Sequence, residues 1–387
     1  MKTSKWLYLL LAVVFSACSG SSEDEYVGNW EYIGDFAGPG RAHAATFVID
    51  NVGYVCAGDN GYKTSRRDLW KVVIDSNGEG SWSNTTDSLP KGMERQRAVG
   101  FSVNGKGYVG TGWDGDQKVM RDFWEYDPAK SGQLNPDGTS AAWRQVAPMP
   151  AERGAVERYD ALSFELNGVV YVGTGYTAGA DKQSLLDFWE FVPPADENSL
   201  GEWKEAPSIK GSKRRGAVAF VIDGYAYVCT GANSGNTGAY DFWRFDGTEW
   251  TQLRNIISYD DDDDYDDKYE RKMLRQRAVA FVINKKGYIA LGSAVSSGSP
   301  YTTWEYETPV YSDITLITGD IWTQKTSFFN NSYTGNRDGA FVLSFPGKGR
   351  GGEDLVLIGC GQQSSAFTED IWRFYPDDED NTKDDRY

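Results

Sequence analysis

The fold is decided by residues 98–112, which read Ala-Val-Gly-Phe-Ser-Val-Asn-Gly-Lys-Gly-Tyr-Val-Gly-Thr-Gly, together with Asp-Phe-Trp-Glu-Tyr at 122–126 and the later Trp143. Two short apolar runs flank the turn Asn-Gly-Lys-Gly. This arrangement predicts a β-hairpin, because Asn and Gly accept the backbone conformation that tight turns require. The aromatic run at 122–126 predicts a third strand, and Trp143 opens a fourth. The stretch therefore predicts one four-stranded antiparallel unit.

The unit returns along the chain with a period of about sixty residues, which is typical of a repeat architecture. Six predicted first strands share a Phe, at Phe47, Phe101, Phe164, Phe220, Phe281 and Phe341. Six second strands end in a Gly, at Gly58, Gly112, Gly175, Gly231, Gly292 and Gly361. Six third strands hold a Trp, at Trp70, Trp124, Trp189, Trp243, Trp304 and Trp372. Fourth strands open with a Trp at only five places, Trp82, Trp143, Trp203, Trp250 and Trp322.

The strand that the sixth unit lacks is found at the other end of the chain. Residues 29–33 read Asn-Trp-Glu-Tyr-Ile and are similar to Ala-Trp-Arg-Gln-Val at 142–146. We expect residues 29–33 to pair with residues 370–374 and to close a ring, because closure removes the exposed edges of an open array.

The apolar first strand, the glycine-bearing second strand and the spaced aromatic pair resemble the kelch β-propeller family over residues 29–375. The double glycine of that family appears here as Gly-Thr-Gly, Cys-Thr-Gly or Ala-Leu-Gly. The resemblance implies an all-β, six-bladed propeller of four-stranded antiparallel blades at 27–376, followed by an acidic tail at 377–387. In that fold Cys56 and Cys229 would lie three blades apart, too far to form a disulfide.

Composition argues against several classes of function. The formal net charge of −17 repels phosphate backbones, so we expect no nucleic-acid partner. His43 is the single histidine, which leaves almost no room for a His-built metal site. It also excludes any Ser-His-Asp triad that is not built on His43. We expect neither a metal nor a cofactor.

The N-terminus is typical of an exported protein. In residues 1–17, Lys2 and Lys5 precede an apolar run at 6–15 that is too short to span a bilayer. The Phe-Ser-Ala-Cys sequence ending at Cys18 resembles the lipobox of bacterial lipoproteins, although Phe stands where that family commonly has Leu. The resemblance implies cleavage before Cys18 and its acylation; the alternative is an ordinary secretory signal.

The segment after Cys18 bears on the cellular location of the protein. Residues 18–26 are polar and flexible, and their acidic end is similar to the surface-export tags of Bacteroidota lipoproteins. We expect a monomeric outer-membrane lipoprotein of the bacterial cell envelope, periplasmic or surface-exposed, held to the membrane through its lipid alone.

A recurring arginine precedes the first strands. Six residues before the shared Phe stand Arg41, Arg95, Arg158, Arg214, Arg275 and, in the sixth repeat, Gly335. Two residues further on stand His43, Arg97, Asp160, Gly216, Arg277 and Arg337. Alternating strand direction places these loops on the same face as the loops between second and third strands, so a cup ringed by arginines is predicted. The arginine fork suits carboxylates. For any one of these arginines, however, we favour a scaffold role, in which the Arg ties adjacent blades together, over a role in ligand binding.

The predicted ligand-binding face comprises Arg41, Arg95, Arg97, Trp113, Asp114, Arg158, Tyr176, Arg214, Arg275, Arg277 and Arg337. Trp113 and Tyr176 occur in single repeats, and such aromatic platforms stack on sugar rings. The first function hypothesis is therefore a binding module for a glycan or an envelope protein.

The second hypothesis is an enzyme. Galactose oxidase shares the kelch fold but needs two histidines, so a single histidine excludes it. A metal-independent sugar mutarotase or epimerase resembling sialic-acid mutarotase stays open. Its acid, base and carboxylate-holding groups would be Glu94, Arg95, Glu157 and Arg158. The alternative is that these residues form salt bridges between blades and have a structural role.

One acidic run also leaves two interpretations. Residues 260–267 are carboxylates interrupted only by Tyr265, and carboxylates are ligands for calcium. The run lacks the glycine turn and terminal Glu of an EF-hand loop. We expect a solvated loop, as for most runs of like charge.

Overall fold

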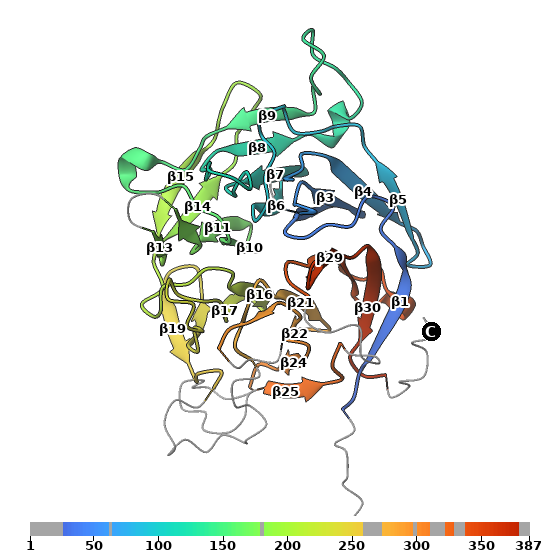
Figure 1. Ribbon diagram of the computed structural model, residues 1–387, viewed down its shortest axis with the longest axis vertical. Coiled ribbons are helices and arrows are strands. Elements are labelled where there is room, and N and C mark those ends of the chain that lie inside the picture. The colour runs from blue at the N-terminus through green and yellow to red at the C-terminus, as the bar shows by residue number, and fades with distance from the viewer. Residues whose placement is uncertain are drawn as a thin grey trace, which may run out of the picture.

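The computed structural model describes residues 26–61, 64–178, 182–257, 273–296, 300–309, 322–328 and 337–378. Six four-stranded antiparallel sheets stand around a central axis as the blades of a propeller (Figure 1). The all-β, six-bladed fold predicted from the repeats is therefore confirmed. The predicted signal peptide, Cys18, the acidic run at 260–267 and the tail beyond residue 378 lie outside the described residues. No helix in the described ranges has the length and hydropathy needed to cross a membrane.

Each blade runs from an inner strand at the axis to an outer strand at the rim. Blade 1 is β2 (Ala45–Ile49), β3 (Val52–Cys56), β4 (Leu69–Ile74) and β5 (Gly80–Asn84). Blade 2 is β6 (Val99–Val103), β7 (Lys106–Gly110), β8 (Phe123–Tyr126) and β9 (Trp143–Val146). Blade 3 is β10 (Leu162–Leu166), β11 (Val169–Gly173), β14 (Phe188–Val192) and β15 (Glu202–Ala206). Blade 4 is β16 (Val218–Ile222), β17 (Tyr225–Cys229), β18 (Phe242–Phe245) and β19 (Trp250–Leu253). Blade 5 is β21 (Val279–Ile283), β22 (Lys286–Ala290), β24 (Thr303–Tyr306) and β25 (Trp322–Lys325). Blade 6 is β26 (Phe341–Phe345), β27 (Leu355–Gly359), β30 (Asp370–Tyr375) and β1 (Asn29–Asp35).

Blade 6 joins the two ends of the propeller. Its outer strand β1 pairs antiparallel with β30, with Trp30 opposite Phe374. The predicted closure of the ring is therefore confirmed. Trp30 is buried against Phe374 and Phe328, and its Nε1–H donates to Thr303 Oγ1 of blade 5 at 3.3 Å. The closing strand thus ties blade 6 to blade 5 as well as to β30.

The core lies between neighbouring blades. In five blades a Phe of the inner strand stacks on a Tyr of the second strand with ring centroids 5.0 to 5.3 Å apart, in the pairs Phe47–Tyr54, Phe101–Tyr108, Phe164–Tyr171, Phe220–Tyr227 and Phe281–Tyr288. Gly107 and Gly287 face Phe rings of the preceding blade so closely that a Cβ would clash with them. Glycine recurs there because the blades approach closely.

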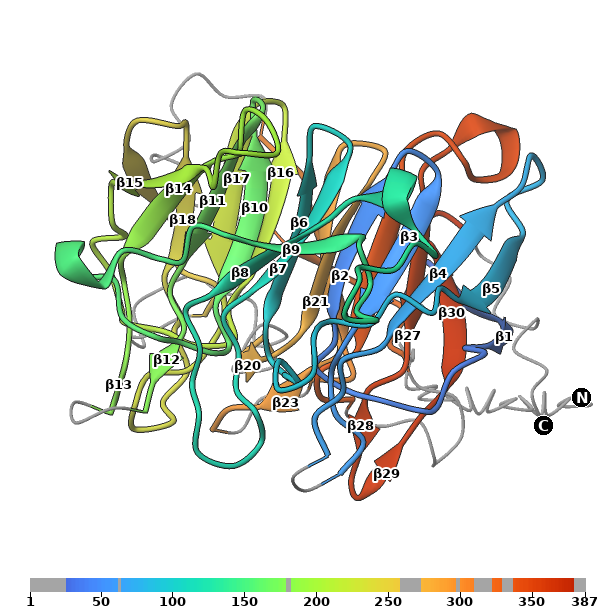
Figure 2. The ribbon, with the colours of Figure 1, turned by 90° about the horizontal axis from the view of Figure 1, so that it is seen from above.

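Three two-stranded sheets lie on one face of the disc (Figure 2). They pair β12 (Tyr176–Thr177) with β13 (Gln183–Ser184), β20 (Arg275–Gln276) with β23 (Ser293–Ala294), and β28 (Gln362–Gln363) with β29 (Ala366–Phe367). We call this the axial face. It holds the loops that precede each inner strand and the loops between second and third strands, which is where the sequence predicts the cup.

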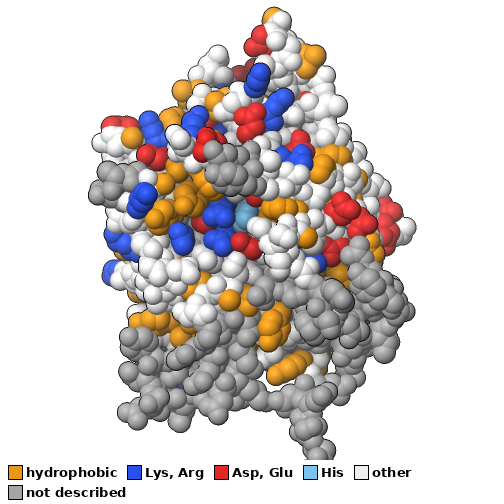
Figure 3. All heavy atoms as spheres, viewed as in Figure 1, with side chains coloured by type: hydrophobic (Ala, Val, Ile, Leu, Met, Phe, Trp, Pro, Cys, Tyr) orange, Lys and Arg blue, Asp and Glu red, His pale blue; other side chains and the backbone are white. Residues whose placement is uncertain are grey.

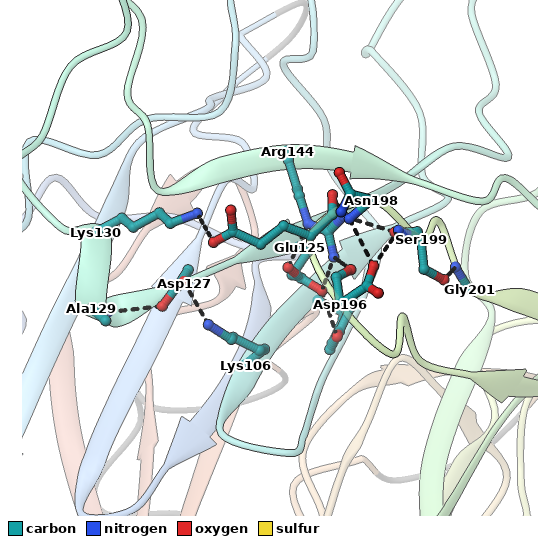
Figure 4. Close-up of polar contacts among 12 residues, drawn as sticks. Lys106, Glu125, Asp127, Ala129, Lys130, Arg144, Asp196, Asn198, Ser199 and Gly201 are labelled. Carbon is teal, nitrogen blue, oxygen red and sulfur yellow. Dashed lines mark hydrogen bonds and ion pairs between the residues drawn. The ribbon is translucent and has the colours of Figure 1, made fainter.

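Loops also join blades at the rim. Arg144 of β9 donates Nε–H to Glu125 Oε1 at 2.7 Å and Nη1–H to the carbonyl of Ser199 at 2.8 Å, so the loop after β14 is held against blade 2 (Figure 4). Lys130, in the 3-10 helix η1 (Pro128–Lys130), pairs with Glu197 of the same loop at 2.5 Å. Two further 3-10 helices in the described part of the chain are η2 (Ala151–Arg153) and η5 (Arg350–Gly352). This network stabilises the rim and lies away from the axis.

Cys56, Cys229 and Cys360 are buried and free. Burial raises the pKa of the Cys229 and Cys360 thiols to about 12. These thiols are therefore protonated at neutral pH and pack as small apolar side chains.

Candidate functional site

A recurring set of arginines, one from each repeat, is buried inside the blades: Arg41, Arg95, Arg158, Arg214, Arg275 and Arg337. Arg95 shows their common arrangement. Its Nη1–H donates to the carbonyl of Thr111, at the end of the second strand, at 3.1 Å. Both Nη groups reach the two carboxylate oxygens of Asp122, before the third strand, at 3.1 and 3.0 Å. The guanidinium therefore ties three segments of one blade together.

The same carboxylates also hold the tryptophans of the third strands. Asp122 accepts the indole N–H of Trp124 at 2.7 Å, and equivalent bonds join Asp68 to Trp70, Asp187 to Trp189, Asp241 to Trp243 and Asp370 to Trp372. In blade 5, Thr302 Oγ1 accepts from both Trp304 and Arg275. Burial raises the pKa of Asp122, but Arg95 and Trp124 lower it by more, so the carboxyl stays ionised. The structure thus places the side chains of these arginines in the scaffold, buried and not exposed on the axial face.

Arg337 belongs to the set of buried arginines because the sixth repeat is aligned differently in the structure than the sequence predicts. From the sequence, Phe341 is predicted to correspond to Phe47. In the structure Phe341 pairs with Gly359, as Ala45 pairs with Cys56, so Phe341 corresponds to Ala45. The predicted alignment of the sixth repeat is therefore wrong by two residues, and Arg337 binds Asp370 at 2.6 Å as the other buried arginines bind their partners.

At the axis, one residue from each blade forms a ring, which we call the axial ring. Its members are His43, Arg97, Asp160, Gly216, Arg277 and Gly339, all with φ between 51° and 63°. Each N–H donates to the carbonyl of the member in the preceding blade, at 2.8 to 3.3 Å, and the sixth bond closes the circle. The left-handed backbone turns every member the same way, and it favours Gly and, among other residues, Asn and Asp.

Four side chains of the axial ring and two neighbouring carboxylates meet in a cluster of charges, which we call the axial cluster: His43, Arg97, Asp160 and Arg277, with Asp59 and Asp338. Asp160 lies 3.5 Å from Arg97 and 3.5 Å from Arg277. Asp338 accepts from Arg277 Nε at 2.7 Å and lies 3.5 Å from His43 Nε2. The Nδ1 of His43 is 2.8 Å from Asp59. Residues from five blades therefore share one polar centre.

The protonation of His43 follows from these neighbours. Burial lowers the pKa of His43, but the carboxylates of Asp338 and Asp59 raise it by more, so the pKa lies above its ordinary value. Burial raises the pKa of Asp338, whereas His43 and Arg277 bring it well below the usual range. The cluster is thus a set of paired opposite charges at the centre of the face.

An aromatic wall stands beside the axial cluster and consists of Trp113, Tyr159 and Tyr176. Trp113 stacks on Tyr159 with centroids 5.9 Å apart, and Tyr159 lies 5.5 Å from Tyr176. The guanidinium of Arg97 lies 5.9 Å from the Tyr159 centroid, and that of Arg215 lies 4.9 Å from the Tyr176 centroid. Figure 3 shows this face, with Lys and Arg side chains gathered around the one histidine and apolar side chains next to them.

The other predicted site residues are placed as follows. Asp114 accepts backbone N–H groups of residues 116, 117 and 118, so it shapes the loop that carries Trp113. Glu94 pairs with Arg67 at 3.6 Å, and Glu157 is half-buried. Because Arg95 and Arg158 are bound to carboxylates of different blades, the predicted acid–base set is not assembled at one point. In the part of the chain that the structure describes, no group of three His, Cys, Asp or Glu residues could hold a metal ion.

Sequence reasoning did not single out Tyr159, Arg215 and Asp338. All three stand one residue before an axial-ring member, and each forms a β-bridge to the loop after its second strand. Tyr159, for example, bridges Tyr176. The residue type at this position differs from blade to blade, and this variation is the signal that could have found it.

Comparisons with known proteins bear on the fold. No protein-family model matches the sequence, and no curated protein matches it. Among solved structures, that of YjhT matches with a TM-score of 0.59 and 14% sequence identity, over 88% of this chain and 96% of that chain. Over most of its length the chain is therefore similar in fold to a propeller-type protein of known structure.

Proposed function

We propose that the protein is a binding module whose axial face takes a glycan that bears a carboxylate. The observation that carries the proposal is the position of the aromatic wall directly beside Arg97. Trp113 and Tyr176 are half-buried, so each keeps part of its ring accessible to a sugar. Arg97 offers a planar fork of donors that suits a carboxylate. Both halves of an acidic sugar thus have a partner within one small area.

We further propose that the module acts at the bacterial cell envelope, held by an acylated Cys18. The support is the sequence of residues 1–18, with its short apolar run and lipobox-like end. Metabolic labelling with a radioactive fatty acid is expected to mark the wild-type protein and to leave the Cys18→Ala variant unlabelled. Label retained by that variant would refute the anchor.

Replacement of Trp113 with alanine is expected to weaken binding of an acidic sugar about ten-fold, because a stacked aromatic contributes about 1.5 kcal/mol. Binding is measured by ligand-observed NMR against a panel of acidic and neutral sugars. Tyr225→Ala is the matched control, since Tyr225 begins β17 at the opposite end of blade 4 from the axial face. Equal affinity in wild type and Trp113→Ala would reject the aromatic wall as the site. If the axial face binds a protein and none of the sugars, the ligand is a protein and the proposal of a glycan ligand is wrong.

A second candidate is an enzyme that opens and closes the ring of such a sugar, as a mutarotase does. The observation that favours it is His43, the one side chain of the axial cluster whose ordinary pKa is near neutral and which contacts two carboxylates. Anomerisation of N-acetylneuraminate followed by NMR tests it. A rate equal to that in buffer would leave binding as the function.

A further inference from the structure

The two arginines of the axial cluster are bound to different extents. Arg277 donates Nε–H to Asp338 at 2.7 Å and Nη2–H to Ser293 Oγ at 3.2 Å, and its Nη1 lies 3.5 Å from Asp160. Burial lowers the pKa of Arg277, but Asp160 and Asp338 raise it by more. Its donors are therefore turned toward the protein, and its side chain is only 14% exposed.

Arg97 is held far more loosely. Among the residues that the structure describes, its one ion pair is the contact of Nη1 with Asp160 at 3.5 Å, at the limit of a hydrogen bond. Within the described residues its Nε–H has no hydrogen-bond partner. The side chain is 23% exposed and lies over Tyr159 of the aromatic wall. Arg97 is thus the less fully paired and more exposed arginine of the cluster, and because its Nε is buried, a ligand reaches it through its Nη groups.

Asp160 already occupies the position of an anion between the two arginines. Its side chain is 3% exposed and lies at the same long distance, 3.5 Å, from both guanidinium groups. The negative charge of Asp160 opposes a ligand carboxylate that approaches Arg97 in two ways. Asp160 retains the guanidinium by its own attraction, and it repels a second carboxylate brought close to it.

We propose that Asp160 is an internal counter-ion that competes with the carboxylate of a ligand for Arg97 and so sets the affinity of the axial face for acidic sugars. The inference rests on the proposed function and adds a specificity-determining residue to it. It follows that loss of the Asp160 charge strengthens the binding of acidic sugars and leaves neutral sugars unaffected. Loss of Arg97 has the opposite effect on acidic sugars.

Asp160→Asn is a clean test because the backbone of residue 160 is suited to asparagine. Asp160 has φ of 53°, and Asn is among the residues that adopt this left-handed conformation most readily. The variant keeps the two backbone hydrogen bonds of residue 160 in the axial ring, to Arg97 and from Gly216. Only the charge of the side chain and its hold on the arginines change.

The experiment follows the Nε–H signal of Arg97 in protein labelled with nitrogen-15 arginine, assigned with Arg97→Lys. Glucuronate and acetate are titrated as carboxylate probes, and glucose is the neutral probe. We expect Kd for glucuronate to fall about five-fold in Asp160→Asn, as for loss of an ion pair contributing about 1 kcal/mol. Asp59→Asn is the matched control. It removes the same charge from the axial cluster beside His43, and we expect a smaller gain because Asp59 pairs with His43 and not with Arg97.

The outcomes separate this inference from the proposed function. An unchanged Kd in Asp160→Asn, or an equal gain in Asp59→Asn, overturns the competition by Asp160 while binding to the face stands. If the Arg97 signal of Asp160→Asn responds to neither glucuronate nor acetate, Arg97 is not the anion site and the inference fails. The proposed function is then judged by the Trp113→Ala comparison alone. Thermal unfolding of each variant verifies that the fold is retained.

Discussion

Replacement of Asp241 with alanine is expected to lower the free energy of unfolding by about 3 to 5 kcal/mol, the cost of leaving one member of a buried ion pair alone. Asp241 accepts from Arg214 Nη2 and from Trp243 Nε1, both at 2.5 Å, and from the backbone N–H of Ser212 at 3.1 Å. Arg214 is fully buried, so no water compensates its charge once the carboxylate is gone. Equilibrium unfolding in urea measures the loss as a lower midpoint at an unchanged slope.

Two further variants isolate the charge from the contact. Asp241→Asn keeps an acceptor for Trp243 and is expected to lose less than Asp241→Ala. Asp246→Ala, in the exposed turn of the same blade, removes hydrogen bonds only to the turn residues 248 and 249 and is expected to cost about 1 kcal/mol or less. If Asp241→Ala unfolds at the same midpoint as Asp246→Ala, the buried pair does not stabilise the blade.

The scaffold role of these arginines has a trace in the sequence. In three repeats an Asp stands 27 residues after the Arg and two residues before a Trp, as in Arg95, Asp122 and Trp124. An arginine that recurs together with its own carboxylate is already neutralised. The recurring Arg by itself shows only that a positive charge stands at one position of each repeat. The direction in which its guanidinium points depends on the carboxylate partner. The predicted ligand-binding face therefore included arginines whose scaffold role this paired column of Asp residues already indicates.

The repeat pattern predicted the fold for a physical reason. The alternation of apolar and polar residues in a strand and the glycines of a turn are local signals that the sequence shows directly. Each blade packs against the next to form the core, so one clear unit such as residues 98–112 predicts the structure of the other repeats. The same logic failed at Phe341. Blade 6 has Phe at both ends of its inner strand, Phe341 and Phe345, and only strand pairing reveals that Leu343 stands where Phe47 does.

The axial cluster could be predicted only in part. His43, Arg97, Asp160 and Arg277 share one column of the repeat, so their common level follows from the sequence. The ion pairs among these side chains do not follow from the sequence, because they form between residues of separate blades that meet near the axis. The contact between His43 and Asp338 joins residues almost 300 positions apart. Closure of the ring is what brings blade 1 against blade 6, and the site therefore depends on the strand that makes this closure.

Trp30→Ala is accordingly expected to destabilise the whole propeller by about 3 to 5 kcal/mol, the range for truncation of a buried Trp. Trp30 is 4% exposed, packs edge-on against Phe328 at 4.8 Å and lies 4.9 Å from Phe374. Its indole N–H also donates to Thr303 Oγ1 and to the carbonyl of Thr326, both in blade 5 or directly after it. The truncation therefore loosens β1 from β30 and blade 6 from blade 5 together. Urea unfolding measures the effect.

The matched control is Trp82→Ala, because Trp82 occupies in blade 1 the place that Trp30 occupies in blade 6. Trp82 is half-buried and its main aromatic contact is Phe36 at 4.9 Å, so we expect a loss of about 1 to 2 kcal/mol. Deletion of residues 1–36 extends the test, since it opens the edge of β30 and exposes Phe374. We expect that chain to aggregate on size exclusion. A folded, monomeric product with wild-type unfolding would show that the inner contacts between blades 1 and 6 hold the ring without its closing strand.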